Sequence, residues 1–542
     1  MERILDWNKY LDTAAKMVSE GIVMLKNENN ALPLDTDKEV AVFGRIQFHY
    51  YKSGTGSGGM VNVTKVVNIL DGLIDNGVKV NEKLLDTYRK WDKENPFDLG
   101  EGWGGEPWSQ KEMPLDEGLV KETAKSCETA IVIIGRTAGE EQDNKLEAGS
   151  YLLSDDEIEM LTVVRENFKK VVLLLNVGNI IDMTDINRIA PDAVLYVWQG
   201  GMTGGKGTAD VLTGKVSPSG KLPDTIAYKA SDYPSDANFG REKSRDIYAE
   251  DIYVGYRYYD TSKVRVQYPF GFGLSYTEFT YSDLIIEEDG IKVSVTNTGD
   301  RDGAEVVQMY VGLPNAIVFR PEKELKGFAK VYLKAGESRQ LRIPFDDKTF
   351  RYWNIKTGQW EIETGTYQIM VGASVADIRL TGMTERTGNS NGYPYNPAKM
   401  PYYYTGIVQK ISDEEFRELL GHEIPNRRWS GNLEVNDAIC QMYYAKSRLA
   451  RLIYRCLTKM KKKSEAQGKP DLNILFIYNM PFRAIAKMTG GAVSMEMVYG
   501  IVDAVNGHFM LGVKKVVGGY FRNRRNNKKY EKLLKGAGGK CR

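Results

Sequence analysis

Residues 128–154, ETAIVIIGRTAGEEQDNKLEAGSYLLS, contain the segment that decides the fold expected for this chain. The apolar and mostly β-branched run 130–134 is typical of a buried strand, and Gly135 ends it. The loop that follows carries four carboxylates, namely Glu140, Glu141, Asp143 and Glu147. In open α/β sheets, ligands bind in the crevice beyond the carboxyl ends of the strands, so these carboxylates are candidates for proton transfer. A solvated acidic turn is the alternative interpretation.

Strands and helices alternate on both sides of this central segment. Three other runs have the composition of short buried strands, at residues 39–43, 171–175 and 193–198. Residues 155–167 are expected to form a helix, because Ser154 and Glu157 make a capping box before it. Residues 8–28 carry apolar side chains at spacings of three and four, which predicts one amphipathic helix. We therefore expect residues 1–228 to form one α/β sandwich domain, with a parallel sheet covered by helices.

The pattern of the sequence changes after this domain. Residues 229–280 form a connecting segment that includes YPFGFGLSYTEF. Residues 281–382 contain segments of period two bounded by Asn, Gly and Asp turns, which predicts an all-β sandwich of the fibronectin type III kind. Residues 383–436, rich in proline and tyrosine, are expected to be a linker.

Residues 437–542 are expected to form a basic amphipathic helical tail. This part holds 22 lysines and arginines against 6 aspartates and glutamates, whereas the whole chain has a net charge of only +1. Such an asymmetry indicates that the tail has a different partner from the body of the protein. An anionic membrane surface and another protein domain are the two partners expected. Nucleic acid is not expected, because no base-reading motif accompanies the charge.

Composition also limits the cofactors and the location. The four cysteines form no CxxC pair and the chain has three histidines, so neither a metal site nor a disulfide framework is expected. No other cofactor is expected. The N-terminal residues mix charged and apolar types and predict no secretory signal, and no window of about 18 apolar residues predicts a membrane span. The expected location is the cytoplasm, with the tail at the inner face of the membrane.

Six stretches, in order along the chain, resemble glycoside hydrolase family 3, the family of β-glucosidases and β-xylosidases. They are AAKMVSEGIVMLKNENNALPL (14–34), GEEQDNKLEAGSYLLS (139–154), LLLNVGN (173–179), VLYVWQGGMTGGKGTADVLTGKVSPSGKLPDT (194–225), YPFGFGLSYTEF (268–279) and VTNTGDRDGAEVVQMYV (295–311). Together they cover about residues 10–382, and their combination is highly specific. The resemblance implies the α/β sandwich and the fibronectin-like domain of that family, which also has a catalytic (β/α)8 barrel.

The resemblance further implies the residues of the site. Retaining hydrolysis in the family uses an aspartate nucleophile from the barrel and, in many members, a glutamate acid/base from a loop of the sandwich domain, about 5 to 5.5 Å apart. That loop often has the form G-E-G-x-D-R. Three positions match it here, Gly139, Glu140 and Asp143, while Glu141 and Asn144 replace the second glycine and the arginine. Glu140 is therefore the expected acid/base, and Glu141 and Glu147 are the alternatives.

The sequence shows neither the Ser-Asp-Trp type motif of the nucleophile nor a barrel of about 200 residues or more. The chain is therefore expected to supply the acid/base loop of a β-glucosidase-type hydrolase, with the nucleophile coming from a separate (β/α)8 barrel protein. It is not expected to be active alone. The ligand expected is a β-linked glucoside or a similar oligosaccharide, contacted by Arg45, Lys52 and Ser57 of the first loop. The alternative is a non-catalytic carbohydrate-binding or scaffolding protein derived from such an enzyme.

Overall fold

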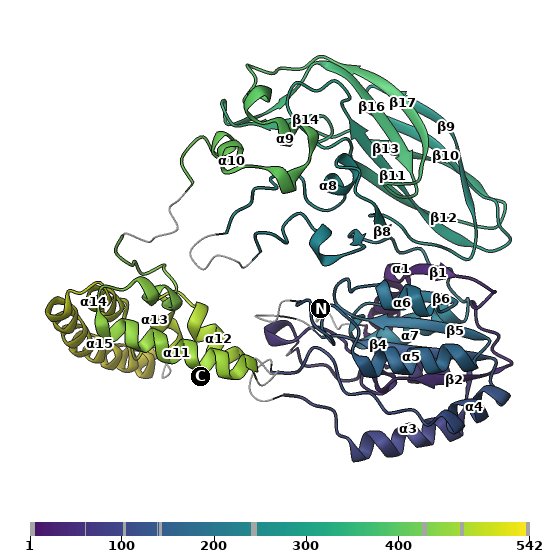
Figure 1. Cartoon of the computed structure of the whole chain (residues 1–542), viewed down its shortest axis with the longest axis horizontal. Coiled ribbons are helices and arrows are strands. Elements are labelled where there is room, and N and C mark those ends of the chain that lie inside the picture. Colours follow the sequence, from purple (N-terminus) through teal and green to yellow (C-terminus); the bar gives the residue numbers. More distant parts are fainter. Residues whose placement is uncertain are drawn as a thin grey trace.

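The computed structural model describes residues 6–59, 61–100, 105–137, 139, 144–239, 246–424, 431–466 and 471–537 of the 542. Figure 1 shows an α/β domain, an antiparallel β-sandwich and a helical tail, in this order along the chain. This order confirms the fold class predicted from the sequence.

The α/β domain is built on a six-stranded sheet with the strand order β1-β6-β5-β4-β2-β3. Its strands are β1 (Val23–Asn27), β2 (Glu39–Phe43), β3 (Lys79–Val80), β4 (Thr129–Gly135), β5 (Lys170–Asn176) and β6 (Ala193–Tyr196). All neighbouring strands are parallel except β1, which pairs antiparallel with β6 at one edge. The predicted central strand is β4, and its apolar residues are completely buried.

Helices cover both faces of this sheet. Alternate residues of β4 point to opposite faces, so Val132 joins the core that contains α3 (Glu82–Glu94), α4 (Glu117–Ser126), α5 (Asp155–Asn167) and α6 (Thr184–Ile189). Ile133 joins the core under α2 (Ile69–Asp75) and α7 (Gly204–Leu212), against which α1 (Trp7–Gly21) also packs. The capping box predicted for α5 is present: the Ser154 hydroxyl accepts the Glu157 N–H, and the Glu157 carboxylate accepts the Ser154 N–H.

The single helix predicted over residues 8–28 is wrong in its last third, residues 22–28. Helix α1 ends at Gly21, and residues 23–27 form β1 instead. The apolar residues of this stretch fit helical spacing, but pairing with β6, some 170 residues away, buries Val23 and Leu25 more completely than a helix extending into solvent would.

The β-sandwich packs two antiparallel sheets face to face. One sheet has the order β13-β10-β9 and the other the order β12-β11-β16-β17. The strands are β9 (Phe279–Glu287), β10 (Gly290–Asn297), β11 (Gly303–Gly312), β12 (Glu324–Leu333), β13 (Ser338–Pro344), β16 (Gly365–Gly372) and β17 (Ile378–Arg386), with a separate hairpin of β14 (Arg351–Asn354) and β15 (Gln359–Ile362). Ion pairs Lys330–Glu20 and Lys221–Glu305 join the sandwich to the α/β domain.

The stretch predicted as a linker carries structure of its own. Before the sandwich, the connecting segment contains β7 (Ile226–Ala227), α8 (Tyr256–Thr261) and β8 (Val266–Tyr268); after it come α9 (Pro401–Thr405) and α10 (Asp413–Leu420). Tyr403 is fully buried in one aromatic cluster with Tyr253 and Phe319. The tyrosines that indicated a linker are therefore packing residues that tie residues 397–420 to the connecting segment.

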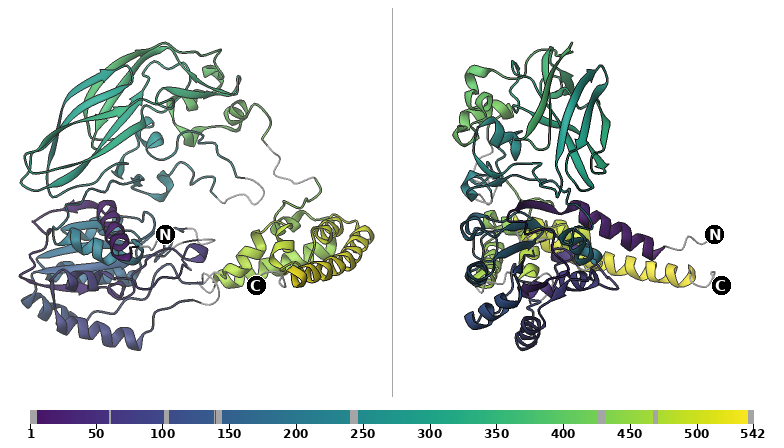
Figure 2. Two further views of the ribbon diagram at one scale, coloured as in Figure 1. Left: turned by 180° about the vertical axis from the view of Figure 1, so that it is seen from behind. Right: turned by 90° about the vertical axis from the view of Figure 1, so that its right-hand side faces the viewer.

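The tail is a bundle with its own apolar core. Its helices are α11 (Arg448–Ala466), α12 (Leu472–Asn479), α13 (Ala484–Met488), α14 (Met495–Val505) and α15 (Phe509–Ala537), preceded by a 3₁₀ turn at Ile439–Tyr444. In Figures 1 and 2 the tail lies on the same side of the sandwich as the α/β domain. Of the helices in the described ranges, none is long and apolar enough to cross a membrane.

Candidate active site

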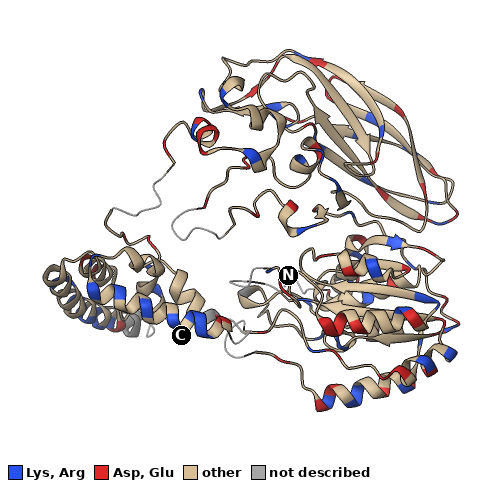
Figure 3. Ribbon diagram, in the orientation of Figure 1, with Lys and Arg blue, Asp and Glu red and all other residues tan. Residues whose placement is uncertain are grey.

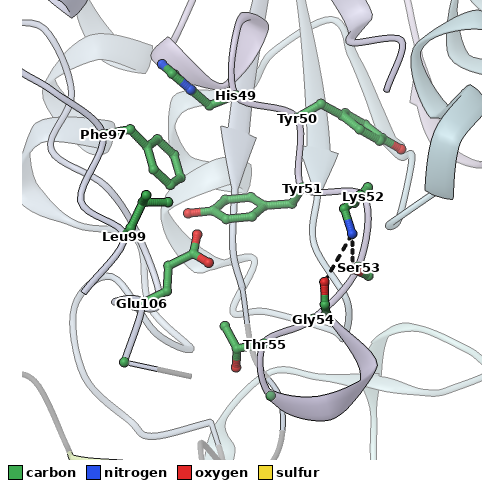
Figure 4. A pocket seen from close by; sticks show the side chains of 13 residues that line it. His49, Tyr50, Tyr51, Lys52, Ser53, Gly54, Thr55, Phe97, Leu99 and Glu106 are labelled. Carbon is green, nitrogen blue, oxygen red and sulfur yellow. Dashed lines mark hydrogen bonds between the residues drawn. The ribbon is translucent and has the colours of Figure 1, made fainter. Parts of the chain in front are cut away.

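A pocket of about 360 Å³ opens beyond the carboxyl ends of β2 and β4. One wall is the loop that follows β2, from His49 to Gly59, and the other wall consists of Phe97, Leu99, Gly105 and Glu106 (Figure 4). This is the edge of a parallel sheet at which ligands bind in α/β proteins. Three glycines of the first loop, Gly54, Gly56 and Gly59, therefore line a cavity.

Two glycines allow the loop after β2 to cross the end of β4. Gly44 has φ of +96°, and a Cβ there would lie 2.3 Å from the carbonyl oxygen of Ile133. A Cβ on Gly135 would lie 2.8 Å from side-chain atoms of Ile46 and Tyr51. Only glycine fits at these positions, so the loop packs directly onto the strand that precedes the acidic loop.

Asn176, the last residue of β5, holds the pocket loop in place. Its Oδ1 accepts the Tyr51 N–H at 2.8 Å, and its Nδ2 donates to the carbonyl oxygens of Tyr51 and Trp198 at 3.0 and 2.6 Å. The neighbouring Tyr50 hydroxyl accepts the Gly200 N–H at 2.7 Å. The loop is therefore tied to the end of β5 and to the segment that follows β6, which pre-forms the pocket wall.

The acidic loop begins on this wall. Gly139 and Thr55 form an isolated parallel β-bridge, and a Cβ on Gly139 would lie 2.4 Å from the carbonyl oxygen of Thr55. Thr55 lines the pocket. The residues that follow Gly139, among them the candidates Glu140 and Glu141, lie outside the described residues. The bridge nevertheless fixes where the loop leaves the sheet, one residue before Glu140.

Glu147 has an exposed side chain and does not line the pocket. Its carbonyl oxygen accepts the N–H groups of Ser150 and Leu152, so its backbone closes a tight turn. Lys145, at the start of this turn, has its ammonium 5.0 Å from the ring centroid of Trp108. The turn thus packs against the segment that leads away from Glu106.

The three residues predicted to contact a substrate occupy different positions. Arg45 is 2% exposed, and its guanidinium binds the Asp92 carboxylate at 2.9 Å and the carbonyl oxygens of Lys111 and Asn95. It lies behind the pocket and stacks on Phe97, which lines it. Lys52 lines the pocket and donates to the Gly59 carbonyl oxygen at 3.1 Å. The backbone of Ser57 is part of the same loop, but its side chain lies outside the described part.

Glu106 is the carboxylate that the structure brings into the pocket. Figure 4 shows its side chain directed toward the hydroxyl of Tyr51. Burial, with a contribution from the charge of Asp98, raises the pKa of Glu106 to about 7. Burial, together with the charge of Glu106, also raises the pKa of Tyr51. A carboxyl with a pKa near 7 is suited to holding or donating a proton at neutral pH.

Replacing Glu106 with glutamine is expected to change how stability depends on pH. The folded protein keeps the Glu106 proton between about pH 4.5 and pH 7 whereas the unfolded chain releases it, so this carboxyl destabilises the fold as the pH rises through that range. The free energy of unfolding of the variant, measured relative to that of the native chain, should therefore be about 1 kcal/mol higher at pH 8 than at pH 4. This value is reduced for solvent screening. Urea unfolding at both pH values measures this, and an equal difference at both would contradict it.

A buried ion pair supports the acidic loop from below. Arg136, the residue after β4, pairs with Glu157 of α5, and their side chains are 3% and 2% exposed. The Arg136 guanidinium also donates to the carbonyl oxygens of Gly135 and Ser150. Both ends of the acidic loop are thereby bound to one side chain.

Sequence reasoning missed Glu106 and Asn176. Glu106 lies in a segment rich in Trp, Gly and Pro that shows no periodicity, and its only signal is a lone carboxylate among aromatic residues. Asn176 directly follows a predicted strand. A polar residue at the carboxyl end of a buried strand indicates a binding site. Within the described ranges, no group of three or more His, Cys, Asp or Glu residues could hold a metal ion.

Two family models match the chain. Residues 22–276 match the glycosyl hydrolase family 3 C-terminal domain, and residues 305–375 match a fibronectin type III-like domain.

Several characterised proteins are similar to the chain. A β-glucosidase of Ruminococcus albus is 59% identical over 340 residues, which cover 62% of this chain and 36% of the relative. An exo-α-(1→6)-L-arabinopyranosidase of Bifidobacterium longum is 34% identical over 403 residues, which cover 72% of this chain and 50% of the relative. The chain thus spans between about a third and a half of these two proteins.

Solved structures show the same similarity. A β-glucosidase from Paenibacillus barengoltzii has 44% identity and a TM-score of 0.66, with 72% of this chain and 43% of that chain covered. β-Glucosidase 3B from Thermotoga neapolitana, solved with α-D-glucose, has 36% identity and a TM-score of 0.65, with 71% of this chain and 55% of that chain covered.

Proposed function

Because this chain belongs to glycosyl hydrolase family 3 through its C-terminal-type domain and its fibronectin type III-like domain, we propose that it supplies the acid/base half of a site that hydrolyses β-glucosides. Glu140 donates the proton to the leaving oxygen, and Glu141 and Glu147 are the alternatives. The observation that carries this proposal is the bridge between Gly139 and Thr55, which starts the acidic loop on the wall of the pocket. Lys52 and Ser57 contact the sugar from the same loop.

The nucleophile comes from a (β/α)8 barrel. A single acid/base carboxylate protonates the leaving group but forms no glycosyl intermediate, so a second carboxylate about 5 to 5.5 Å away is required. No sheet in the described residues closes into an eight-stranded barrel. We propose that the barrel faces the pocket and brings its aspartate opposite the acidic loop.

A non-catalytic carbohydrate-binding role is the second candidate. The observation that favours it is that the walls of the pocket, including Tyr51, Phe97 and Lys52, all come from this chain. Aromatic faces and a few polar groups are the components from which sugar sites are built. Binding of a glucoside without hydrolysis would support this role.

Hydrolysis assays separate the two roles. The purified chain is incubated with p-nitrophenyl β-glucoside, alone and with family barrel proteins, and with p-nitrophenyl α-L-arabinopyranoside as a second substrate. We expect p-nitrophenol to be released only when a barrel is present. Absence of release in every combination, with glucoside binding retained, would leave the binding role in place of the catalytic one.

The location proposed for the chain is the cytoplasm. The basic tail is proposed to bind a partner at the inner face of the membrane, either the lipid surface or another protein. The tail has 22 basic residues against 6 acidic ones, and this positive charge supports an anionic partner.

A further inference from the structure

One end of the tail bundle exposes a group of apolar side chains, here called the apolar end. Its members come from the start of α11 and the start of α15: Leu449, Leu452, Ile453, Phe509, Met510 and Leu511. The three consecutive residues of α15 are 56%, 79% and 47% exposed. Large apolar groups exposed together in this way mark a surface that contacts something apolar.

Contacts at this end bring the two helices together. The Ser447 N–H, one residue before α11, donates to the carbonyl oxygen of Val505 at the end of α14. Gly500 of α14 and Gly512 of α15 approach closely, since a Cβ on either would lie 2.5 to 2.7 Å from a backbone oxygen of the other. A groove of about 280 Å³ runs between α11 and α15 and is lined by Leu449, Ile453, Phe509 and other apolar residues.

Basic residues follow the apolar ones along α15. A concave patch farther along the helix is lined by Phe521 and five cations, Arg524, Arg525, Lys528, Lys529 and Lys532. In the described part of α15, the ion pairs involve Lys515 and Arg522 and none of these five. Basic residues also recur along α11, as Figure 3 shows. The tail thus combines an apolar end with five cations of α15 that form no ion pair with the residues that the structure describes.

The arrangement selects among possible partners. A second copy of this tail would bring two strongly positive surfaces together, which electrostatic repulsion disfavours. Phe509, Met510 and Leu511 are consecutive, so they point in directions about 100° apart around the helix. A flat or grooved protein surface would cover one of these directions, whereas a fluid apolar phase covers all three. Lipid also presents the negative charge that these five cations of α15 attract.

We propose that the tail docks on a membrane containing anionic phospholipid, with the apolar end inserted among the acyl chains and the cations of α15 against the headgroups. This deepens the tail's proposed location by naming lipid as the partner, and it is independent of the glycosidase proposal. Such docking places the tail in the membrane interface. It requires no membrane-spanning helix, and none of the helices in the described ranges is long and apolar enough to be one.

Co-sedimentation of the full chain with vesicles tests the proposal. We expect the chain to bind phosphatidylcholine vesicles that contain phosphatidylglycerol, and to bind vesicles of phosphatidylcholine alone much more weakly. Raising the ionic strength from about 0.1 M to about 1 M should release it. Phe509→Ser with Met510→Ser should lower the affinity at least about tenfold, and Arg524→Glu with Lys528→Glu at least about 25-fold.

Matched variants elsewhere provide the controls. Phe328→Ser with Ile285→Ser removes exposed apolar groups from the sandwich, and Lys90→Glu with Lys93→Glu reverses exposed charges on α3. Both should sediment like the native chain. Equal binding to the two vesicle types, unchanged binding of the tail variants, or release by inorganic phosphate at matched ionic strength would each overturn the proposal. The apolar residues replaced in the tail are exposed, so circular dichroism should show the bundle folded.

Discussion

Replacing Glu157 with glutamine is expected to lower the free energy of unfolding of the α/β domain by about 3 to 5 kcal/mol. Glu157 and Arg136 form an ion pair in which both side chains are almost completely buried. Glutamine has nearly the same shape and retains an oxygen that can accept the Ser154 N–H, so the capping interaction is kept. What is lost is the charge, and the Arg136 guanidinium is left buried without its counter-ion.

Denaturant unfolding of the variant measures this loss. Glu159→Gln is the matched control, because Glu159 lies on the same helix with an exposed side chain and should change stability by less than about 0.5 kcal/mol. Replacing both partners, Arg136→Met with Glu157→Met, should cost less than Glu157→Gln alone, since no unpaired charge remains. Equal losses for Glu157→Gln and Glu159→Gln would show that the pair does not support the loop.

Replacing Glu140 with glutamine is expected to lower kcat/KM for glucoside hydrolysis by about 10² to 10⁴ when the chain is assayed with the proposed barrel partner. Glutamine cannot give a proton to the leaving oxygen. The loss should depend on the leaving group, because a dinitrophenolate departs without protonation whereas an alkoxide does not. We therefore expect a small effect on dinitrophenyl β-glucoside and a large one on cellobiose.

Glu159→Gln serves as the control for this prediction, because that side chain is exposed and does not line the pocket. It should retain nearly full activity on both substrates. If the loss in Glu140→Gln were the same for both leaving groups, a role in binding or folding would replace that of proton donor. If Glu141→Gln or Glu147→Gln showed the dependence on leaving group instead, the acid/base would be that residue.

Local signals in the sequence account for much of the fold. The strand at 130–134 and the capped helix α5 were predictable because β-branched runs and capping boxes act over a few residues. Strand β1 was not, because its partner β6 is far away in sequence and its apolar spacing fits a helix equally well. Tyr403 was assigned to a linker because burial by Tyr253 and Phe319 depends on tertiary contacts.

The site was less predictable than the fold. The resemblance to family 3 identified the acidic loop, which in the structure begins at the bridge between Gly139 and Thr55. Arg45 illustrates the opposite case. Its partner Asp92 is 47 positions away, so the sequence could not reveal that the guanidinium is already bound. Glu106 and Tyr51 line the same pocket although they are far apart in the sequence, so only the folded chain brings them together.

Titration calorimetry with methyl β-glucoside tests the central claim most directly, namely that the pocket beyond β2 and β4 binds sugar. Ser53→Trp places a large ring in the pocket, and Ser282→Trp makes the same change on the exposed surface of β9. We predict that the native chain and Ser282→Trp bind the glucoside alike, and that Ser53→Trp weakens binding at least about tenfold, or 1.4 kcal/mol. Equal binding by Ser53→Trp and the native chain would contradict the assignment of this pocket.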